Sequence, residues 1–68
     1  MHIHKSVTPE RVERAVMRSR RGTENPGFCI ACGKSTEGVE PDARKYLCHA
    51  CLLPAVYGAE ELLIMIAA

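Results

Sequence analysis

The chain has 68 residues, four cysteines and a formal net charge of +1. This length allows one small domain, and no apolar run approaches the roughly 20 residues that a membrane-spanning helix needs. The charge is unevenly divided along the chain. Residues 1–27 hold six Lys and Arg against three Glu, a balance of +3, and residues 28–68 hold three against five acidic residues, a balance of −2.

The first 27 residues predict an extended arm followed by a basic helix. Thr8 is suited to the N-cap and Pro9 to the first helical position, and Gly22 ends the pattern. The apolar residues of this segment share one face of a helix: Val12, Ala15 and Val16. The sequence therefore predicts a helix over residues 9–21. Because its apolar stripe is thin, this helix is expected to lean on another element.

Arginines follow one another along the predicted helix: Arg11, Arg14, Arg18, Arg20 and Arg21. Four of them recur at intervals of three or four residues and so share one side. Such a row neutralises phosphates, which makes nucleic-acid binding one hypothesis. A solvated helix face is the alternative, because Glu10 and Glu13 are interleaved and residues 1–27 contain no aromatic side chain on which bases could stack.

All four cysteines lie in two Cys-x-x-Cys pairs, Cys29–Cys32 and Cys48–Cys51, with fifteen residues between the pairs. A two-residue gap turns both sulfurs of a pair toward one point, and two pairs supply the four thiolates that tetrahedral zinc binds. Iron suits the same sulfurs. Disulfides of a secreted domain are disfavoured, because residues 1–27 lack the apolar stretch of a secretion signal. We expect bound zinc, a reducing cytoplasmic compartment, and an unfolded ribbon without metal.

Histidines are the remaining candidates for metal binding. His49 lies inside the second cysteine pair, but four cysteines already complete a tetrahedral shell, so this side chain is expected to face solvent or to bond to a sulfur. A closed shell also has no open position for water, and no catalytic role is expected. His2 and His4 are interpreted as incidental residues of a mobile terminus, with capture of copper or nickel as the alternative.

The segments around the cysteines predict tight turns and one short strand. Gly33 follows the first pair and supplies the flexible position that such a turn requires, whereas Leu52 stands at this place after the second pair. This departure is expected to alter the second turn. Glu37-Gly38 and Pro41-Asp42 predict chain reversals, and a short strand is predicted for residues 43–47.

Residues 59–68 predict a terminal helix that opens with two glutamates. Its large apolar residues are consecutive: Leu62, Leu63, Ile64, Met65 and Ile66. No amphipathic period is visible in this run, so a strand is the alternative. Five such side chains cannot all turn inward from one helix in so small a fold, and the excess predicts an interface with another protein. Alternatively, they complete the core by packing on Phe28, Tyr46 and Tyr57.

Residues 28–58 resemble the zinc-ribbon group, in which two Cys-x-x-Cys knuckles clamp one zinc ion between short β-hairpins. The run from Phe28 to Gly33, the segment 38–44 and the run from Tyr46 to Cys48 resemble a narrower set of short bacterial and phage zinc-ribbon proteins. This likeness extends to about residue 64. The resemblance implies that the four cysteines are metal ligands, and no activity or further functional residue comes with it.

These patterns together predict a small, zinc-stabilised α+β domain that folds as one unit. It would comprise an arm and basic helix (1–27), a four-cysteine ribbon with short β-hairpins (28–58) and an apolar C-terminal helix (59–68). We expect a non-enzymatic interaction module that binds a protein, either a second copy of itself or a larger partner such as a host machine in a phage setting. Nucleic-acid binding through the helix arginines is the alternative. Neither a membrane nor a small-molecule substrate is expected as partner.

Overall fold

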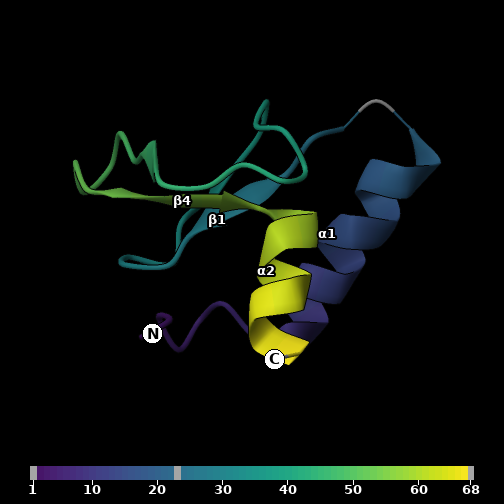
Figure 1. The fold of residues 1–68 in the computed structure, drawn as a ribbon, viewed down its shortest axis with the longest axis horizontal. Coiled ribbons are helices and arrows are strands. Elements are labelled where there is room, and N and C mark those ends of the chain that lie inside the picture. The colour runs from purple at the N-terminus through teal and green to yellow at the C-terminus, as the bar shows by residue number, and fades with distance from the viewer. Residues whose placement is uncertain (1, 23, 68) are drawn as a thin grey trace.

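A four-stranded antiparallel sheet and two helices make up the part of the chain that the computed structural model describes, residues 2–22 and 24–67 (Figure 1). The elements are α1 (Pro9–Arg21), β1 (Gly27–Cys29), β2 (Ser35–Thr36), β3 (Tyr46–Leu47), β4 (Pro54–Gly58) and α2 (Ala59–Ala67). The strands lie in the order β2-β1-β4-β3, each antiparallel to its neighbours. The predicted α+β class, with an N-terminal helix, a ribbon and a C-terminal helix, is confirmed.

Helix α1 begins and ends where the sequence predicts. The Thr8 hydroxyl accepts a hydrogen bond from the Arg11 backbone N–H at 3.2 Å, and Pro9 opens the first turn. A side-chain cap of this kind stabilises a helix by about 1 kcal/mol. The face formed by Val12, Ala15 and Val16 is buried, as its spacing predicts.

The two faces of the sheet carry different clusters of apolar side chains. Phe28 on β1 lies opposite Tyr57 on β4, and both are buried in a cluster with residues of α1 and α2. Cys29 lies opposite Val56, and these two belong to a second buried cluster. Because neighbouring residues of a strand point to opposite faces, Cys29 and Val56 lie on the face turned away from the helices.

Helix α2 forms as predicted, and it lies beside α1 at one end of the sheet (Figure 1). Leu62 is fully buried in the cluster that holds Phe28 and Tyr57, and three further tail residues pack partly buried against it: Leu63, Met65 and Ile66. Only Ile64 of the five is largely exposed, at 65%. Most of the apolar tail thus completes the core by packing against the cluster of Phe28 and Tyr57. The expected packing on Tyr46 is not found, because Tyr46 is 41% exposed and lies outside this cluster.

The junction of β4 and α2 ties the ribbon to the helices. The first amide groups of α2 donate to loop carbonyls, from Ala59 to Pro26 at 3.1 Å and from Glu61 to Pro41 at 3.0 Å. These bonds satisfy N–H groups that a helix start leaves without an intrahelical partner. A Cβ on Gly58 would overlap the Glu40 carbonyl oxygen, so the close approach requires glycine.

The remaining loop predictions hold in part. The chain reverses at residues 37–38 and 41–42, as expected. The strand predicted for residues 43–47 is shorter, Tyr46–Leu47, because Ala43 lies in the preceding turn and its carbonyl accepts from the Gly58 N–H at 3.0 Å. No helix in the described ranges is long and apolar enough to cross a membrane.

Candidate metal centre

The four cysteines meet in one cluster. Their Sγ atoms all lie within 4.8 Å of one another, with Cys29 and Cys51 at 3.6 Å and Cys32 and Cys48 at 3.8 Å. Four sulfurs about 2.3 Å from a central zinc ion form a tetrahedron with edges of about 3.8 Å. A disulfide would need sulfurs about 2.0 Å apart, and the four thiols are free. Their spacing therefore suits a metal ion bound by all four.

Two turns, the first knuckle (residues 29–34) and the second knuckle (residues 48–53), present these sulfurs. In the first knuckle, Gly33 N donates to the Cys29 carbonyl at 2.8 Å and Cys29 N donates to the Lys34 carbonyl at 2.9 Å. In the second, the corresponding bonds are Leu52 N to Cys48 O at 2.7 Å and Cys48 N to Leu53 O at 2.8 Å. The two backbones therefore follow the same hydrogen-bond pattern.

Leu52 occupies the left-handed conformation that Gly33 occupies in the first knuckle. The φ angles are +65° at Leu52 and +83° at Gly33. Glycine adopts this region freely, whereas a side chain costs about 1–2 kcal/mol there. The expectation that Leu52 alters the second turn is wrong, because the leucine takes up the strained angle and the hydrogen bonds of the turn are retained.

Backbone amides within the knuckles favour thiolates. The N–H groups of Cys51 and Ala50 lower the pKa of Cys48 to about 6. The Lys34 N–H favours the Cys32 thiolate in the same way, but burial and the Cys29 and Cys48 thiols outweigh it and raise the pKa of Cys32. Without a metal, thiolates so close together repel one another and protons are shared between them. A divalent cation would replace those protons.

The same balance applies at the second cysteine of the second knuckle. The Leu53 N–H favours the Cys51 thiolate, but burial and the neighbouring thiols of Cys29, Cys48 and Cys32 raise the pKa of Cys51 to about 12. Cys29 and Cys48 are buried, whereas Cys32 and Cys51 are half-buried. The first cysteine of each knuckle thus lies deeper in the fold than the second.

The N-terminal arm, residues 2–7, covers the first knuckle. The His4 N–H donates to the Ile30 carbonyl at 2.7 Å, and a Cβ on Gly33 would overlap Ser6 Oγ and lie 2.8 Å from His4 Nδ1. His4 Nδ1 accepts from the Ser6 N–H at 3.1 Å. His4 is therefore a half-buried structural residue, and its assignment to a mobile terminus is wrong. The hydrophobic residues of the arm were too few to predict this docking.

The second knuckle has no such cover among the described residues. His49 corresponds in position to Ile30 and is exposed, which is the solvent-facing alternative of the two expected. Leu52 and Leu53 are 70% and 50% exposed, and Leu47, just before the knuckle, is 53% exposed. Leu47 lies opposite Pro54 on the same hairpin. The hairpin of β3 and β4 thus carries large apolar side chains in solvent.

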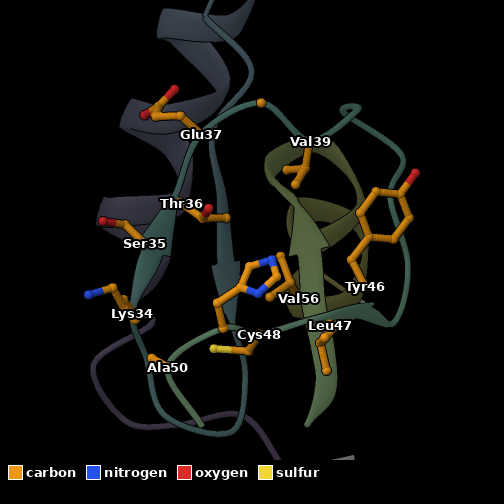
Figure 2. Close-up of a pocket in the computed structure, with 12 residues that line it drawn as sticks. Lys34, Ser35, Thr36, Glu37, Val39, Tyr46, Leu47, Cys48, Ala50 and Val56 are labelled. Carbon is orange, nitrogen blue, oxygen red and sulfur yellow. The ribbon is translucent and has the colours of Figure 1, made fainter. Parts of the chain in front are cut away.

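A groove of about 530 Å³ lies on the sheet face turned away from the helices. In Figure 2, Val39 and Val56 lie between a side formed by Ser35 and Thr36 and a side formed by Tyr46 and Leu47. The second knuckle contributes further lining residues: Cys48, His49 and Ala50. Sequence reasoning missed this groove because its residues come from three separate segments, 34–39, 46–50 and Val56, that only the folded sheet brings together.

The helix arginines do not form one free basic face. Arg11 donates to the Ser6 carbonyl at 2.6 Å and lies over the Phe28 ring, 4.7 Å from its centroid. Two others form ion pairs, Arg18 with Glu24 at 3.2 Å and Arg20 with Glu60 at 3.1 Å. Within the described ranges, Arg14 and Arg21 are exposed and have no ion-pair partner.

No protein-family model, curated protein or solved structure matches this chain. Its likeness to zinc ribbons therefore rests on its own geometry, four clustered cysteines on a small antiparallel sheet. This arrangement is consistent with a zinc-ribbon-like site, and the cysteine cluster suggests a bound metal ion.

Proposed function

We propose that this chain is a zinc-stabilised module that binds another protein and has no catalytic activity. The observation that carries the proposal is a four-cysteine cluster beside a hairpin whose leucines lie in solvent: Leu47, Leu52 and Leu53. Four thiolates complete the shell of tetrahedral zinc, so the ion would have a structural role and no position for substrate or water. Large apolar side chains that stay exposed together are typical of a protein-binding surface.

Zinc is proposed because a closed site of four cysteines is its ordinary structural arrangement. Iron binds the same donor set, so metal analysis of the purified chain is the test of the ion's identity. The metal would hold together a sheet in which β2 and β3 have two residues each. Strands this short contribute little pairing of their own, and binding of structural zinc contributes roughly 10–16 kcal/mol.

The apolar tail is a second candidate for the protein-binding surface. Most of its side chains contribute to the core, which leaves Ile64 as the exposed large residue of the five. A single exposed isoleucine is ordinary on a protein surface. The three exposed leucines of the hairpin therefore favour the ribbon over the tail as the protein-binding surface. Ile64→Glu distinguishes the two, because it changes the tail and leaves the hairpin as it is.

Nucleic-acid binding through α1 is the alternative function, and its support is the pair of exposed cations Arg14 and Arg21. If it operates, replacement of both by Ala weakens binding to duplex or single-stranded probes and reduces the salt dependence of the affinity. The other three helix arginines, Arg11, Arg18 and Arg20, form intramolecular contacts. Fewer helix arginines are therefore free to contact phosphates than the sequence suggests.

The protein-binding proposal is tested with zinc-loaded chain in two assays. Sedimentation velocity measures self-association, and affinity capture followed by calorimetry with the purified partner measures binding to another protein. The proposal predicts an interaction in at least one assay that is lost when a chelator removes the metal. A zinc-loaded chain that remains monomeric and yields no partner with measurable affinity would contradict it.

A further inference from the structure

Leu52 departs from two local rules at once. It holds a left-handed backbone angle that favours glycine, and its large apolar side chain is 70% exposed. Neither burial nor hydrogen bonding of the side chain offsets the strain. Residues that break local rules without a structural gain concentrate at functional sites. The choice of leucine at this position therefore points to a contact outside the fold of one chain.

Comparison with the first knuckle shows which kind of partner Leu52 excludes from the second. Over Gly33 the N-terminal arm lies so close that a Cβ would overlap Ser6 Oγ. Leu52 carries a Cβ at the corresponding position of the second knuckle, so an extended segment cannot cross that knuckle as the arm crosses the first. A partner must instead be concave and receive the leucine. It must also be apolar, because residues 46–59 contain no Asp, Glu, Lys or Arg.

The chain itself offers a concave apolar surface, the groove over Val39 and Val56. Building on the protein-binding function proposed above, we propose that the partner is a second copy of this chain. Leu52 and Leu53 of each copy would enter the groove of the other. The second knuckle supplies both the projecting leucines and part of the groove lining, so the two contacts adjoin. A twofold axis can therefore relate them, and the assembly closes at two copies.

Charge and area set the strength expected for this dimer. The hairpin carries no Asp, Glu, Lys or Arg. The charged residues that line the groove, Lys34 and Glu37, have opposite signs. A standard interface buries roughly 800 Å² per partner. That is about a fifth of this chain's 4435 Å² surface, whereas the proposed contact involves only one hairpin and one groove of each copy. We therefore expect a weak dimer, with a dissociation constant in the micromolar range or above.

The experiment is a dilution series of zinc-loaded chain followed by sedimentation equilibrium and amide NMR. The expected result is a monomer–dimer equilibrium with concentration-dependent shifts at residues 34–38 and 46–53, and unchanged signals in α2. A chain that stays monomeric up to millimolar concentration overturns the proposal. So does a dimer whose shifts fall on α2 instead of the groove and the hairpin.

Two substitutions at Leu52 separate an interface role from a structural one. Leu52→Glu places a charge in the groove and should weaken dimerisation at least tenfold. Leu52→Gly relieves the backbone strain and removes the leucine, so it should keep the fold and the metal yet also weaken dimerisation by roughly tenfold or more. Unchanged dimerisation in the glycine variant would overturn the proposal even if the glutamate variant failed to fold.

Matched controls complete the test. Ile64→Glu makes the same change at an aliphatic residue of similar exposure on α2, 65% against 70% for Leu52, and should leave the dimer intact. If the Ile64→Glu chain were monomeric, the interface would lie on the tail, and the proposal would be overturned. Thr36→Tyr fills the groove from β2 and should weaken the dimer although Leu52 is present. An unaffected dimer in that variant excludes the groove as the receiving surface.

Failure of this inference is distinguishable from failure of the protein-binding function. A zinc-loaded monomer that binds a different protein through the same leucines would reject the dimer and keep the function. A dimer that persists with Leu52→Gly would keep protein binding and reject the knuckle as its site. A chain that forms neither a dimer nor a complex rejects both.

Discussion

The two knuckles share a backbone and differ in their cover. Each cysteine pair is followed by a residue with positive φ, and the backbone hydrogen bonds of the two turns correspond one by one. The N-terminal arm lies on the first knuckle, where the residue is glycine, and no described segment lies on the second, where it is leucine. The shared backbone shape therefore goes with the cysteine pair that both knuckles have. The residue at this position, glycine or leucine, goes with the presence or absence of the covering arm.

The largest expected effect comes from breaking either knuckle. Cys29→Ser and Cys48→Ser each remove one of four thiolates, and both should abolish stoichiometric zinc binding. Because structural zinc contributes roughly 10–16 kcal/mol, more than most domains have as net stability, the ribbon should unfold in both variants. Metal analysis and the dispersion of amide NMR signals are the measurements. A variant that keeps one zinc and a folded sheet would show that three cysteines suffice.

A smaller loss is expected when the first knuckle is given the residue of the second. Gly33→Leu forces a side chain into the left-handed region and against Ser6 and His4. We expect the free energy of unfolding to fall by about 2–5 kcal/mol, from strain and displacement of the arm. Denaturant unfolding with zinc in excess measures it.

Gly38→Ala is the matched control for that substitution. Gly38 also has a positive φ of +82°, but a Cβ there meets nothing within 4 Å. This variant should lose only about 1–2 kcal/mol, the cost of the backbone angle alone. Equal losses at Gly33 and Gly38 would mean that the arm does not constrain the first knuckle.

The converse substitution gives the second knuckle the residue of the first. Leu52→Gly should raise the free energy of unfolding by about 0.5–1 kcal/mol, because relief of the left-handed strain exceeds the added freedom of the unfolded chain. Denaturant unfolding at concentrations too low for association is the measurement. A loss of stability would show that the Leu52 side chain packs within its own chain.

The smallest effect concerns the strand that leads into the second knuckle. The Tyr46 hydroxyl donates to Glu40 at 2.6 Å, which lowers the pKa of Glu40 and raises the pKa of Tyr46. This bond therefore stabilises the fold at neutral pH, and its contribution is lost as pH falls through the lowered Glu40 pKa or rises through the raised Tyr46 pKa. Tyr46→Phe should return the Glu40 pKa toward its ordinary value, which NMR titration of the carboxyl group measures.

Sequence reasoning placed the helices well because their signals are local. Thr8, Pro9 and Gly22 mark the ends of α1 through rules that involve only neighbouring residues. The clustering of the four cysteines also followed from spacing alone. Strands of two or three residues were mostly beyond prediction, because their pairing depends on the cysteine-bearing turns and on contacts distant in sequence.

The apolar tail shows where local reasoning reached its limit. Five consecutive apolar residues have no visible face, so the pattern could not show that Leu62 is buried while Ile64 is exposed. That division is set by α1, which packs beside α2. The arm over the first knuckle and the groove over Val56 were unpredicted for the same reason, since both are contacts between distant segments.

Native mass spectrometry of the purified chain shows whether the two knuckles are halves of one zinc site. We expect one zinc ion per chain, lost together with the fold when a chelator is added. A folded chain without metal, or a mass reduced by the four hydrogens that two disulfides would remove, would contradict it.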